Sequence, residues 1–253
     1  MEEDLSHLDP DTEYRYARVS ALIPAYNEER FIGDVVRRTL SQISEVVVVD
    51  DGSPDGTAAA AREAGAEVIT YEQNQGKGIA IQIGLRAMIK KGVEYVVLLD
   101  ADGQHLPEEI PNFLEAVTRD GSKLLVGNRM HNTRGMPLSR RLTNRFMSWQ
   151  ISLLCGQPVA DTQCGFRMIH RDLLPRLLAG DRAGRFDYET EMIILSSWRG
   201  ERISAVPIST VYGDETSHIN PLSDGWRFLR LMGRYWYKRF HKKSKYSRAR
   251  GDD

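Results

Sequence analysis

Four consecutive valines, Val46 to Val49, lie in the run EVVVVDDGS at residues 45–53, and two aspartates follow them directly. A strand that faces water on one side alternates apolar and polar residues, whereas an unbroken apolar run is typical of a strand buried on both faces. Such strands belong to parallel sheets that helices cover on both sides. The run therefore places the chain in the α/β class, with two acids at the end of an interior strand.

Strand-like and helix-like segments alternate through the first half of the chain. Apolar runs predict strands at residues 18–26, 45–53, 66–71, 93–100 and 123–129, and helices are predicted at 28–43, 55–65, 76–92 and 106–121. This alternation predicts a mostly parallel sheet flanked by helices. Ligands of such sheets bind at the carboxyl ends of the strands. Asp50, Asp51, Asp100 and Asp102 are expected at those ends.

The pattern changes after Arg129. Residues 132–141 are polar and predict a loop, 142–156 and 188–200 predict helices, and 161–172 and 201–212 contain further strands. We divide the chain into an acidic N-terminal tail (1–16), one α/β domain (17–222), and a basic amphipathic C-terminal helix and tail (223–253).

Composition narrows the class of partner and the cellular location. The formal net charge is −1, so we expect no bulk attraction to nucleic acid. Cys155 and Cys164 match no zinc or redox spacing, which favours a reduced, cytosolic protein. The N-terminus lacks the pattern of a signal peptide, and no apolar run approaches the ~20 residues that span a bilayer. We therefore expect a cytoplasmic protein that, if it works at a membrane, lies on its surface.

The turns after the first strands exclude two common nucleotide-binding motifs. PAYNEER (24–30) contains no glycine, and NQGKGIA (74–80) has G-x-G without the third glycine of a dinucleotide-binding loop. The same segment lacks the Lys-Ser/Thr ending of a P-loop.

Four motifs nevertheless point to another nucleotide-binding class. They are ALIPAYNEE (21–29), VVVVDDGSPDGT (46–57), NQGKGIAIQIGL (74–85) and VVLLDADGQHLPEEI (96–110). In this order and spacing they resemble the inverting glycosyltransferases of family 2, which have the GT-A fold, and among them the dolichol- and polyprenyl-phosphate sugar transferases. The resemblance covers Val19 to Arg167. It implies a Rossmann-like nucleotide-binding half joined to an acceptor half, a GDP- or UDP-linked sugar donor and a polyprenyl phosphate acceptor.

The D-x-D-x-Q sequence of Asp100, Asp102 and Gln104 resembles the metal and diphosphate site of that branch. Oxygen ligands of this kind suit Mg²⁺ or Mn²⁺, which would stabilise the charge that develops on the leaving diphosphate. If the chain stays extended, alternate residues point to one side. Asp100 is then either a ligand through water or a ribose contact, and His105 is expected to pack behind the ligands. The alternative is a simple turn at Asp102-Gly103.

The resemblance also implies a set of contacts to the donor nucleotide. A tyrosine ring stacks on the base in this family, and a carboxylate reads the base or ribose, which we assign to Asp51 in preference to Asp50. Gly76 and Lys77 are expected to approach the diphosphate. The predicted nucleotide-sugar contacts are Pro24, Tyr26, Glu28, Asp51, Lys77 and Asp100.

The type of acceptor decides which further residues are needed. A hydroxyl acceptor needs a general base, for which Asp187, Glu189 and Glu191 are candidates. A phosphate acceptor is already anionic and needs cations, which arginine supplies well. The predicted acceptor-phosphate contacts are Arg129, Arg140, Arg141, Arg167 and His218, and the predicted catalytic residues are Asp102, Arg129 and Arg141.

Two alternatives to a polyprenyl-phosphate enzyme therefore stay open. One is a family 2 enzyme that acts on a saccharide hydroxyl in cell-surface polysaccharide synthesis, and the other is a non-catalytic sugar-nucleotide-binding protein. A homo-oligomer is compatible with either.

The segment 223–241 predicts an amphipathic helix. Its apolar side is expected to carry Trp226, Leu229, Gly233, Trp236, Tyr237 and Phe240, and its basic flank Arg227, Arg230, Arg234, Lys238 and His241. Aromatic residues beside basic ones favour the headgroup region of an anionic membrane. We therefore expect attachment to the inner face of the cell membrane through this helix. The alternative is a helix packed on the domain with a solvated basic tail.

Overall fold

The computed structural model describes residues 18–131, 133, 136–179, 187–209 and 221–248. The elements of the first half are β1 (Val19–Ala25), α2 (Glu29–Leu40), β2 (Val46–Asp50), α3 (Thr57–Glu63), β3 (Glu67–Thr70), α4 (Lys77–Lys91), β4 (Tyr95–Leu98), η2 (Pro107–Glu109) and α5 (Ile110–Asp120). The elements of the second half are β5 (Leu124–Asn128), η3 (Arg129–His131), α6 (Leu138–Cys155), β6 (Arg167–His170), η4 (Arg171–Leu173), α7 (Leu174–Leu178), α8 (Asp187–Ser197), β7 (Ile203–Pro207) and α9 (Pro221–Arg248).

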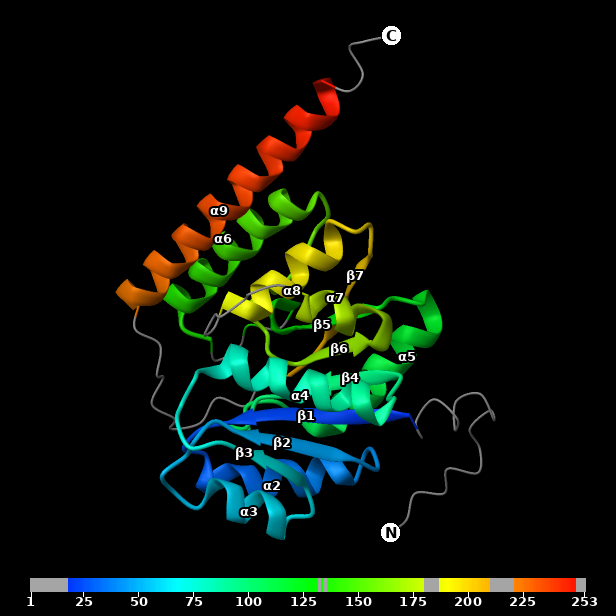
Figure 1. Ribbon diagram of the computed structural model, residues 1–253, viewed down its shortest axis with the longest axis vertical. Coiled ribbons are helices and arrows are strands. Elements are labelled where there is room, and N and C mark those ends of the chain that lie inside the picture. Colours follow the sequence, from blue (N-terminus) through cyan, green and yellow to red (C-terminus); the bar gives the residue numbers. More distant parts are fainter. Residues whose placement is uncertain (1–17, 132, 134–135, 180–186, 210–220, 249–253) are drawn as a thin grey trace.

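The strands form one sheet in the order β3-β2-β1-β4-β6-β5-β7. Strands β1 to β4 are mutually parallel, and β5 pairs parallel with β7. Strand β6 runs antiparallel to both of its neighbours, β4 and β5. The predicted mostly parallel sheet with flanking helices is therefore confirmed (Figure 1).

The valine run forms β2 in the interior of the sheet. Val46, Val47, Val48 and Val49 are buried, as is the whole of β1 beside them. Helix α4 packs against β1 and β2 from one side, and α2 and α3 lie on the other (Figure 1). Cover on both faces explains why the run contains no polar residue.

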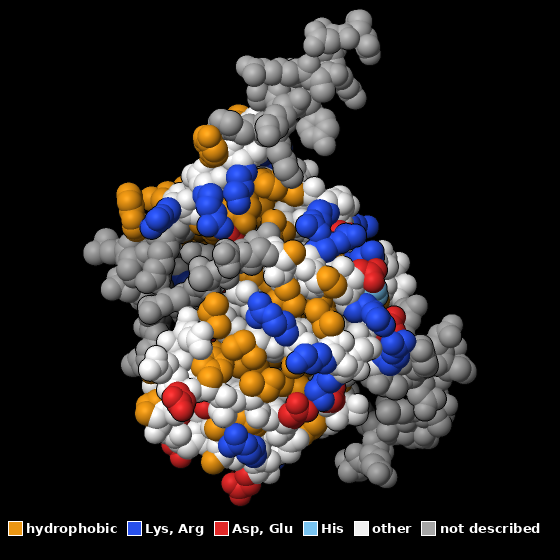
Figure 2. Space-filling view, in the orientation of Figure 1, with side chains coloured by type: hydrophobic (Ala, Val, Ile, Leu, Met, Phe, Trp, Pro, Cys, Tyr) orange, Lys and Arg blue, Asp and Glu red, His pale blue; other side chains and the backbone are white. Residues whose placement is uncertain are grey.

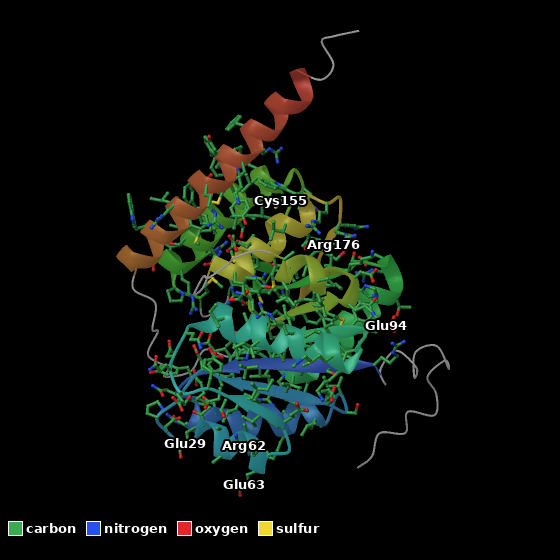
Figure 3. All side chains as sticks on the ribbon, viewed as in Figure 1. Glu29, Arg62, Glu63, Glu94, Cys155 and Arg176 are labelled. Carbon is green, nitrogen blue, oxygen red and sulfur yellow. The ribbon has the colours of Figure 1, made fainter. Side chains whose placement is uncertain are left out.

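The topology brings distant parts of the chain to one edge of the sheet. Because β6 is antiparallel to both β4 and β5, those two strands are parallel to each other. The carboxyl ends of β1, β2, β4 and β5 and the beginning of β6 therefore share one edge, called the carboxyl edge below. In Figure 3, Glu29 follows β1 and lies on the side of the carboxyl edge, whereas Glu94 precedes β4 and lies on the opposite side of the molecule.

The region of residues 132–141 differs in part from the predicted loop. Helix α6 begins at Leu138, with Pro137 as its N-cap, so Arg140 and Arg141 lie in the first helical turn. The sequence predicted a loop here because Leu138 is the one apolar residue beside Pro137, Ser139, Arg140 and Arg141.

The C-terminal helix packs on the domain. In α9, Phe228, Leu231, Met232 and Tyr235 are buried, and the helix contacts α6 and α8. The predicted helix is confirmed, and its packing on the domain agrees with the alternative considered above. Among the described residues, no helix is long and apolar enough to cross a bilayer.

Gly84 tests how tightly α4 packs on the sheet. A Cβ atom at this position would lie 2.1 Å from Cδ1 of Leu22, which is fully buried in β1. Crowding of this kind costs about 1–3 kcal/mol. We expect Gly84→Ala to lower the free energy of unfolding, measured in urea, although alanine otherwise stabilises a helix by about 1 kcal/mol relative to glycine.

The matched control is Gly233→Ala in α9, where an added Cβ meets no atom within 4 Å. This substitution should leave stability unchanged or raise it. Equal stability of the two variants would show that α4 does not pack on Leu22 as described.

Candidate active site

A cavity lies at the carboxyl edge beside β2 and β3. Its volume is about 430 Å³, and it is lined by Asp50, Gly52, Ser53, Pro54, Thr70, Tyr71 and Glu72. The size is within the range of small-ligand sites. Tyr26 stands after β1 at the same edge and is 44% exposed, so its ring is open to a ligand, whereas Pro24 is buried in β1 and Glu28 is half-buried.

Asp51 has a structural role in this arrangement. Its two carboxylate oxygens accept hydrogen bonds from the backbone N–H groups of Gln75 and Gly76, both at 2.7 Å. Gly76 has φ +96°, a conformation that favours glycine. Asp51 therefore fixes the loop that starts α4. Asp50 lines the cavity, where its Oδ1 accepts hydrogen bonds from the N–H and hydroxyl of Ser53. The assignment of Asp51 as the carboxylate that reads the nucleotide stays a prediction.

Lys77, the first residue of α4, bridges two carboxylates. Its Nζ lies 2.5 Å from Oδ1 of Asp100 and 3.1 Å from Oε2 of Glu189 in α8. Burial opposes the charge on Lys77, but the two acids outweigh it and raise its pKa above the ordinary value. Burial also opposes ionisation of Asp100, and the Lys77 ammonium overrides it, which lowers the pKa of that carboxyl. Both groups are charged at neutral pH.

Glu189 keeps one oxygen without a partner. Its Oε1 atom is buried and has no hydrogen-bond partner in the described part of the chain. A buried acceptor left unpaired is costly. The oxygen thus marks a place at this edge where a donor group of a ligand would be stabilised.

The chain turns at Asp102 and does not stay extended. Strand β4 ends at Leu98, Gly103 has φ +74°, and Oδ1 of Asp102 accepts a hydrogen bond from the Gln104 N–H at 3.0 Å. The expectation that alternate residues of an extended chain face one side is therefore wrong. The turn interpretation is right for the backbone, and it leaves the side chains of Asp102 and Gln104 half-buried at the carboxyl edge.

The side chains present at the turn fit a hard divalent cation only with help from a ligand. Asp102, Gln104 and Asp100 offer the oxygen donors that Mg²⁺ and Mn²⁺ prefer. No group of three or more His, Cys, Asp or Glu side chains is arranged to hold a metal ion among the residues described. Asp100 is already paired with Lys77. The donor set therefore suits a cation that arrives with a diphosphate and keeps some of its waters.

Two residues hold Asp100 from behind. His105 is buried, and its Nδ1 accepts the Asp100 backbone N–H at 3.4 Å. Burial lowers the pKa of His105 to about 4, although Asp100 opposes the shift, so the ring is neutral at neutral pH. On the other side, a Cβ atom at Gly165 would lie 2.3 Å from Oδ2 of Asp100. Position 165 therefore has no room for a side chain.

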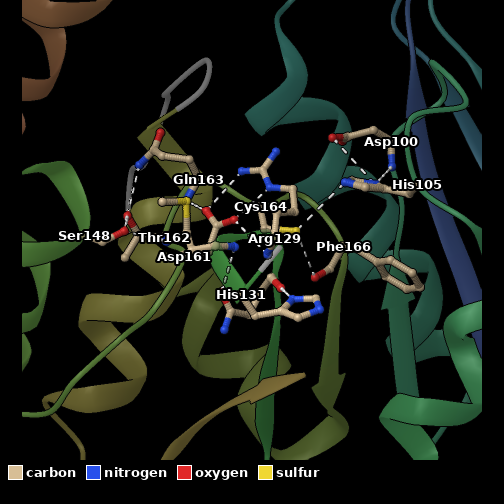
Figure 4. A network of polar contacts seen from close by, with 12 residues as sticks. Asp100, His105, Arg129, His131, Ser148, Asp161, Thr162, Gln163, Cys164 and Phe166 are labelled. Carbon is tan, nitrogen blue, oxygen red and sulfur yellow. Dashed lines mark hydrogen bonds and ion pairs between the residues drawn. The ribbon is translucent and has the colours of Figure 1, made fainter. Parts of the chain in front are cut away.

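Arg129 is paired inside the protein. It follows β5, and its guanidinium donates two hydrogen bonds to Asp161, from Nε at 2.7 Å and from Nη2 at 3.0 Å (Figure 4). Arg129 is 7% exposed. Its positive charge also contributes to the lowered pKa of Asp100, although Lys77 contributes more. Its charge acts at the carboxyl edge, while its direct partner is Asp161.

Arg167 has a different environment from the one expected. It is fully buried, and its guanidinium donates to the backbone carbonyls of Thr162, Cys164 and Glu189. A side chain that holds three carbonyls away from solvent supports the loop before β6. We therefore leave Arg167 out of the acceptor site.

The remaining predicted cations are Arg140, Arg141 and His218. Arg140 and Arg141 are half-buried in the first turn of α6, and neither makes an ion pair with a described acidic residue. His218 and the side chain of Asp187 lie outside the described residues.

Glu191 is committed to the C-terminal helix. It is buried, accepts a hydrogen bond from the Tyr235 hydroxyl at 3.0 Å and pairs with Arg234. Of the three candidate bases, Glu189 is thus paired with Lys77 and Glu191 with α9.

Sequence reasoning missed two residues of the site. Asp161 and Gly165 precede Arg167 in the segment DTQCGFR (161–167), of which only Arg167 was predicted as a site residue. No signal in the sequence pointed to them, because this segment reaches the carboxyl edge only through the antiparallel pairing of β6 with β4.

Comparison with known proteins places this site in a family. Residues 20–178 match the protein family described as "Glycosyl transferase family 2". The chain is 32% identical over 212 residues to the UDP-N-acetylglucosamine–dolichyl-phosphate N-acetylglucosaminyltransferase of Methanococcus voltae, covering 76% of this chain and 84% of that protein. It is 32% identical over 206 residues to the undecaprenyl-phosphate mannosyltransferase of Micrococcus luteus, covering 77% and 84%.

A solved structure shares the fold. Glucosyl-3-phosphoglycerate synthase from Mycobacterium tuberculosis, in complex with Mn²⁺, uridine diphosphate and phosphoglyceric acid, superimposes with a TM-score of 0.67 at 22% identity, covering 90% of this chain and 81% of that one. The expected GT-A fold is thereby confirmed. The matched family and both relatives show that the chain belongs to glycosyltransferase family 2 and is an enzyme.

Proposed function

We propose that this enzyme transfers a sugar from a GDP- or UDP-linked donor to a polyprenyl phosphate, dolichyl or undecaprenyl, with inversion of the anomeric centre and with Mg²⁺ or Mn²⁺. One observation carries the choice of acceptor. Arg140 and Arg141 lie in the first turn of α6 and pair with no described acid. Among the candidate bases for a hydroxyl acceptor, Glu191 is taken up by α9, and Glu189 is ion-paired with Lys77 through one of its two oxygens. Such a site suits an acceptor that brings its own negative charge.

The donor would lie along the carboxyl edge. Its base would enter the cavity beside Asp50, with the Tyr26 ring exposed nearby, and its diphosphate would lie toward Lys77 and Asp102. Asp102 and Gln104 would hold the divalent cation, which supplies positive charge to the leaving diphosphate. Lys77 adds a second positive charge at that place, held by Asp100 and Glu189.

The reaction is a single displacement. An oxygen of the acceptor phosphate forms a bond to the anomeric carbon while the bond from that carbon to the diphosphate oxygen breaks, and the nucleoside diphosphate leaves. No proton has to be removed, because the attacking oxygen is already anionic. Arg140 and Arg141 would bind and orient the phosphate, with the Arg129 charge behind them. Attack from the side opposite the leaving group inverts the anomeric centre.

The names of both relatives include a lipid phosphate acceptor, and they differ in the sugar. This supports the acceptor class and leaves the sugar open. We place the enzyme in the cytoplasm at the inner face of the cell membrane, where a lipid acceptor is available, with α9 as an attachment element.

Asp102→Asn tests the metal and donor half of the proposal. Asparagine keeps an oxygen for the Gln104 N–H but loses the charge that a divalent cation requires. We expect transfer activity to fall about 100-fold or more, since each tenfold loss reflects about 1.4 kcal/mol of transition-state stabilisation. Chelation of the metal with EDTA should abolish the wild-type activity, and the thermal unfolding curve of the variant should be unchanged.

The control is Asp34→Asn, an exposed acid of α2 that pairs only with Arg38 in the described structure. It should retain full activity. Full activity of Asp102→Asn would refute the metal assignment.

Arg140→Gln and Arg141→Gln test the acceptor half. A charge-assisted hydrogen bond to phosphate contributes about 1.5–3 kcal/mol, so each substitution should raise KM for polyprenyl phosphate roughly tenfold or more. KM for the donor should stay the same. Arg62→Gln on the exposed side of α3 serves as the control. An equal rise in both KM values, or no rise for the lipid, would contradict the assignment.

A further inference from the structure

Exposed apolar side chains concentrate on two helices. Of the eleven large apolar side chains that are exposed among the described residues, nine belong to α6 or α9. On α6 they are Leu138, Leu142, Phe146, Trp149 and Leu153, and on α9 they are Trp226, Leu229, Tyr237 and Phe240. The other two, Tyr26 and Ile89, stand apart from them. Soluble proteins rarely expose so many large apolar residues together without a partner.

The exposed residues of α6 form one stripe. They follow each other at intervals of three or four residues along the whole helix, which places them on one face. The buried residues Asn144, Ser148, Ile151 and Leu154 occupy the opposite face. The apolar stripe is therefore separate from the face of α6 that packs on the domain.

The exposed residues of α9 follow the same rule. Trp226, Leu229, Tyr237 and Phe240 recur at helical spacing, while Phe228, Leu231, Met232 and Tyr235 are buried on the other side. The apolar side predicted from the sequence is thus exposed, except for Trp236, which is half-buried against the core, and a different set of residues packs on the domain. Glu191 holds α9 in this rotation through Arg234 and the Tyr235 hydroxyl.

The helices that carry the two stripes are neighbours. Helices α6 and α9 run side by side (Figure 1), and the Arg239 guanidinium donates to the Leu154 carbonyl. Figure 2 shows apolar and basic side chains together over the part of the molecule where these helices lie. The nine exposed residues are called the α6–α9 face below.

Basic residues outnumber acidic ones on the two helices of this face. Helix α6 contains no acidic residue, and Asp224 is the single acid in the sequence of α9. Arg145 of α6 and Arg230, Arg234 and Lys238 of α9 are exposed. A second copy of the chain meeting this face by a two-fold axis would bring like charges together, which is unfavourable. An anionic surface is attracted by the same charges.

We propose that the α6–α9 face, and not α9 alone, is a docking surface for an anionic lipid bilayer. Amphipathic helices of this composition lie in the plane of the headgroups with their apolar side inserted. Trp149 and Trp226 have the amphipathic rings that favour this depth. On the proposed function, the face has a second consequence, because Arg140 and Arg141 stand in the same turn of α6 as Leu138. A lipid phosphate at the bilayer surface would reach them without leaving the membrane.

The test measures binding of the full chain to vesicles of phosphatidylcholine, with or without phosphatidylglycerol, by co-sedimentation without substrates. We expect binding to the anionic vesicles only, and weaker binding as salt rises, because salt shortens the range of the charges. The double variant Phe146→Gln and Trp149→Gln in α6 should weaken binding at least tenfold. The variant Trp226→Gln and Leu229→Gln in α9 should do the same.

Ile89→Gln is the matched control, since Ile89 is an exposed apolar residue of α4 outside the face. It should bind as the wild type does. All the substituted side chains are exposed, so the thermal unfolding curves of these variants should match. Wild-type binding by the α6 variant would overturn the two-helix surface. So would absence of vesicle binding together with a dimer that the α6 variant dissociates in analytical ultracentrifugation.

A separate assay distinguishes this inference from the proposed function. With a short, water-soluble polyprenyl phosphate, the α6 variant should transfer sugar at the wild-type rate, because the acceptor no longer has to be taken from a bilayer. Loss of that activity in the α6 variant would place Phe146 or Trp149 in the catalytic site and contradict a docking role. Lack of transfer by the wild type would refute the proposed function and leave the vesicle result as it stands.

Discussion

The bridge from Lys77 to Asp100 and Glu189 is the interaction on which the rest of the site depends. A parallel sheet collects the ends of its strands at one edge, and here four aspartates stand at the ends of β2 and β4. Like charges gathered in a partly buried place repel each other unless a cation is fixed among them. Lys77 is held there because Asp51 binds the loop before α4 through the N–H groups of Gln75 and Gly76. One acid thus positions the cation that stabilises another.

The same bridge connects the two halves of the enzyme. Asp100 follows β4 in the nucleotide-binding half, whereas Glu189 belongs to α8, which packs beneath α6 and α9. Two positions later on α8, Glu191 anchors α9 through Arg234 and Tyr235. Helix α8 therefore links the donor site to the two helices that carry the exposed apolar face. A donor at the carboxyl edge and a lipid at that face would be positioned by one rigid element.

The local pattern of apolar and polar residues predicted the strands and helices of the α/β sheet, and there is a physical reason for this. The valine run of β2 is buried on both sides, so its composition reports its environment directly. The acids at the strand ends follow from strand boundaries and parallel order alone. The first turn of α6 was missed because Leu138 is the one apolar residue among Pro137, Ser139, Arg140 and Arg141, and a polar segment that contains proline is typical of a loop.

Pairings between distant residues could not be predicted in this way. Arg129 and Asp161 meet because β5 and the segment before β6 reach the same edge, and a single sequence does not contain that information. Arg167 was expected at a phosphate because a guanidinium suits phosphate oxygens, yet its guanidinium donates to buried backbone carbonyls. The exposure of the α6 stripe could not be predicted either, because one sequence does not say which side of an amphipathic helix packs on the domain.

Product formation with a matched pair of acceptors tests the central claim most directly. The full chain would be incubated with Mn²⁺, a panel of UDP- and GDP-linked sugars, and either a short polyprenyl phosphate or the polyprenol of the same length. The account predicts a glycosyl phosphate lipid from at least one donor with the phosphate, and no product from the alcohol. Product from the alcohol or from a saccharide, and none from the phosphate, would contradict it.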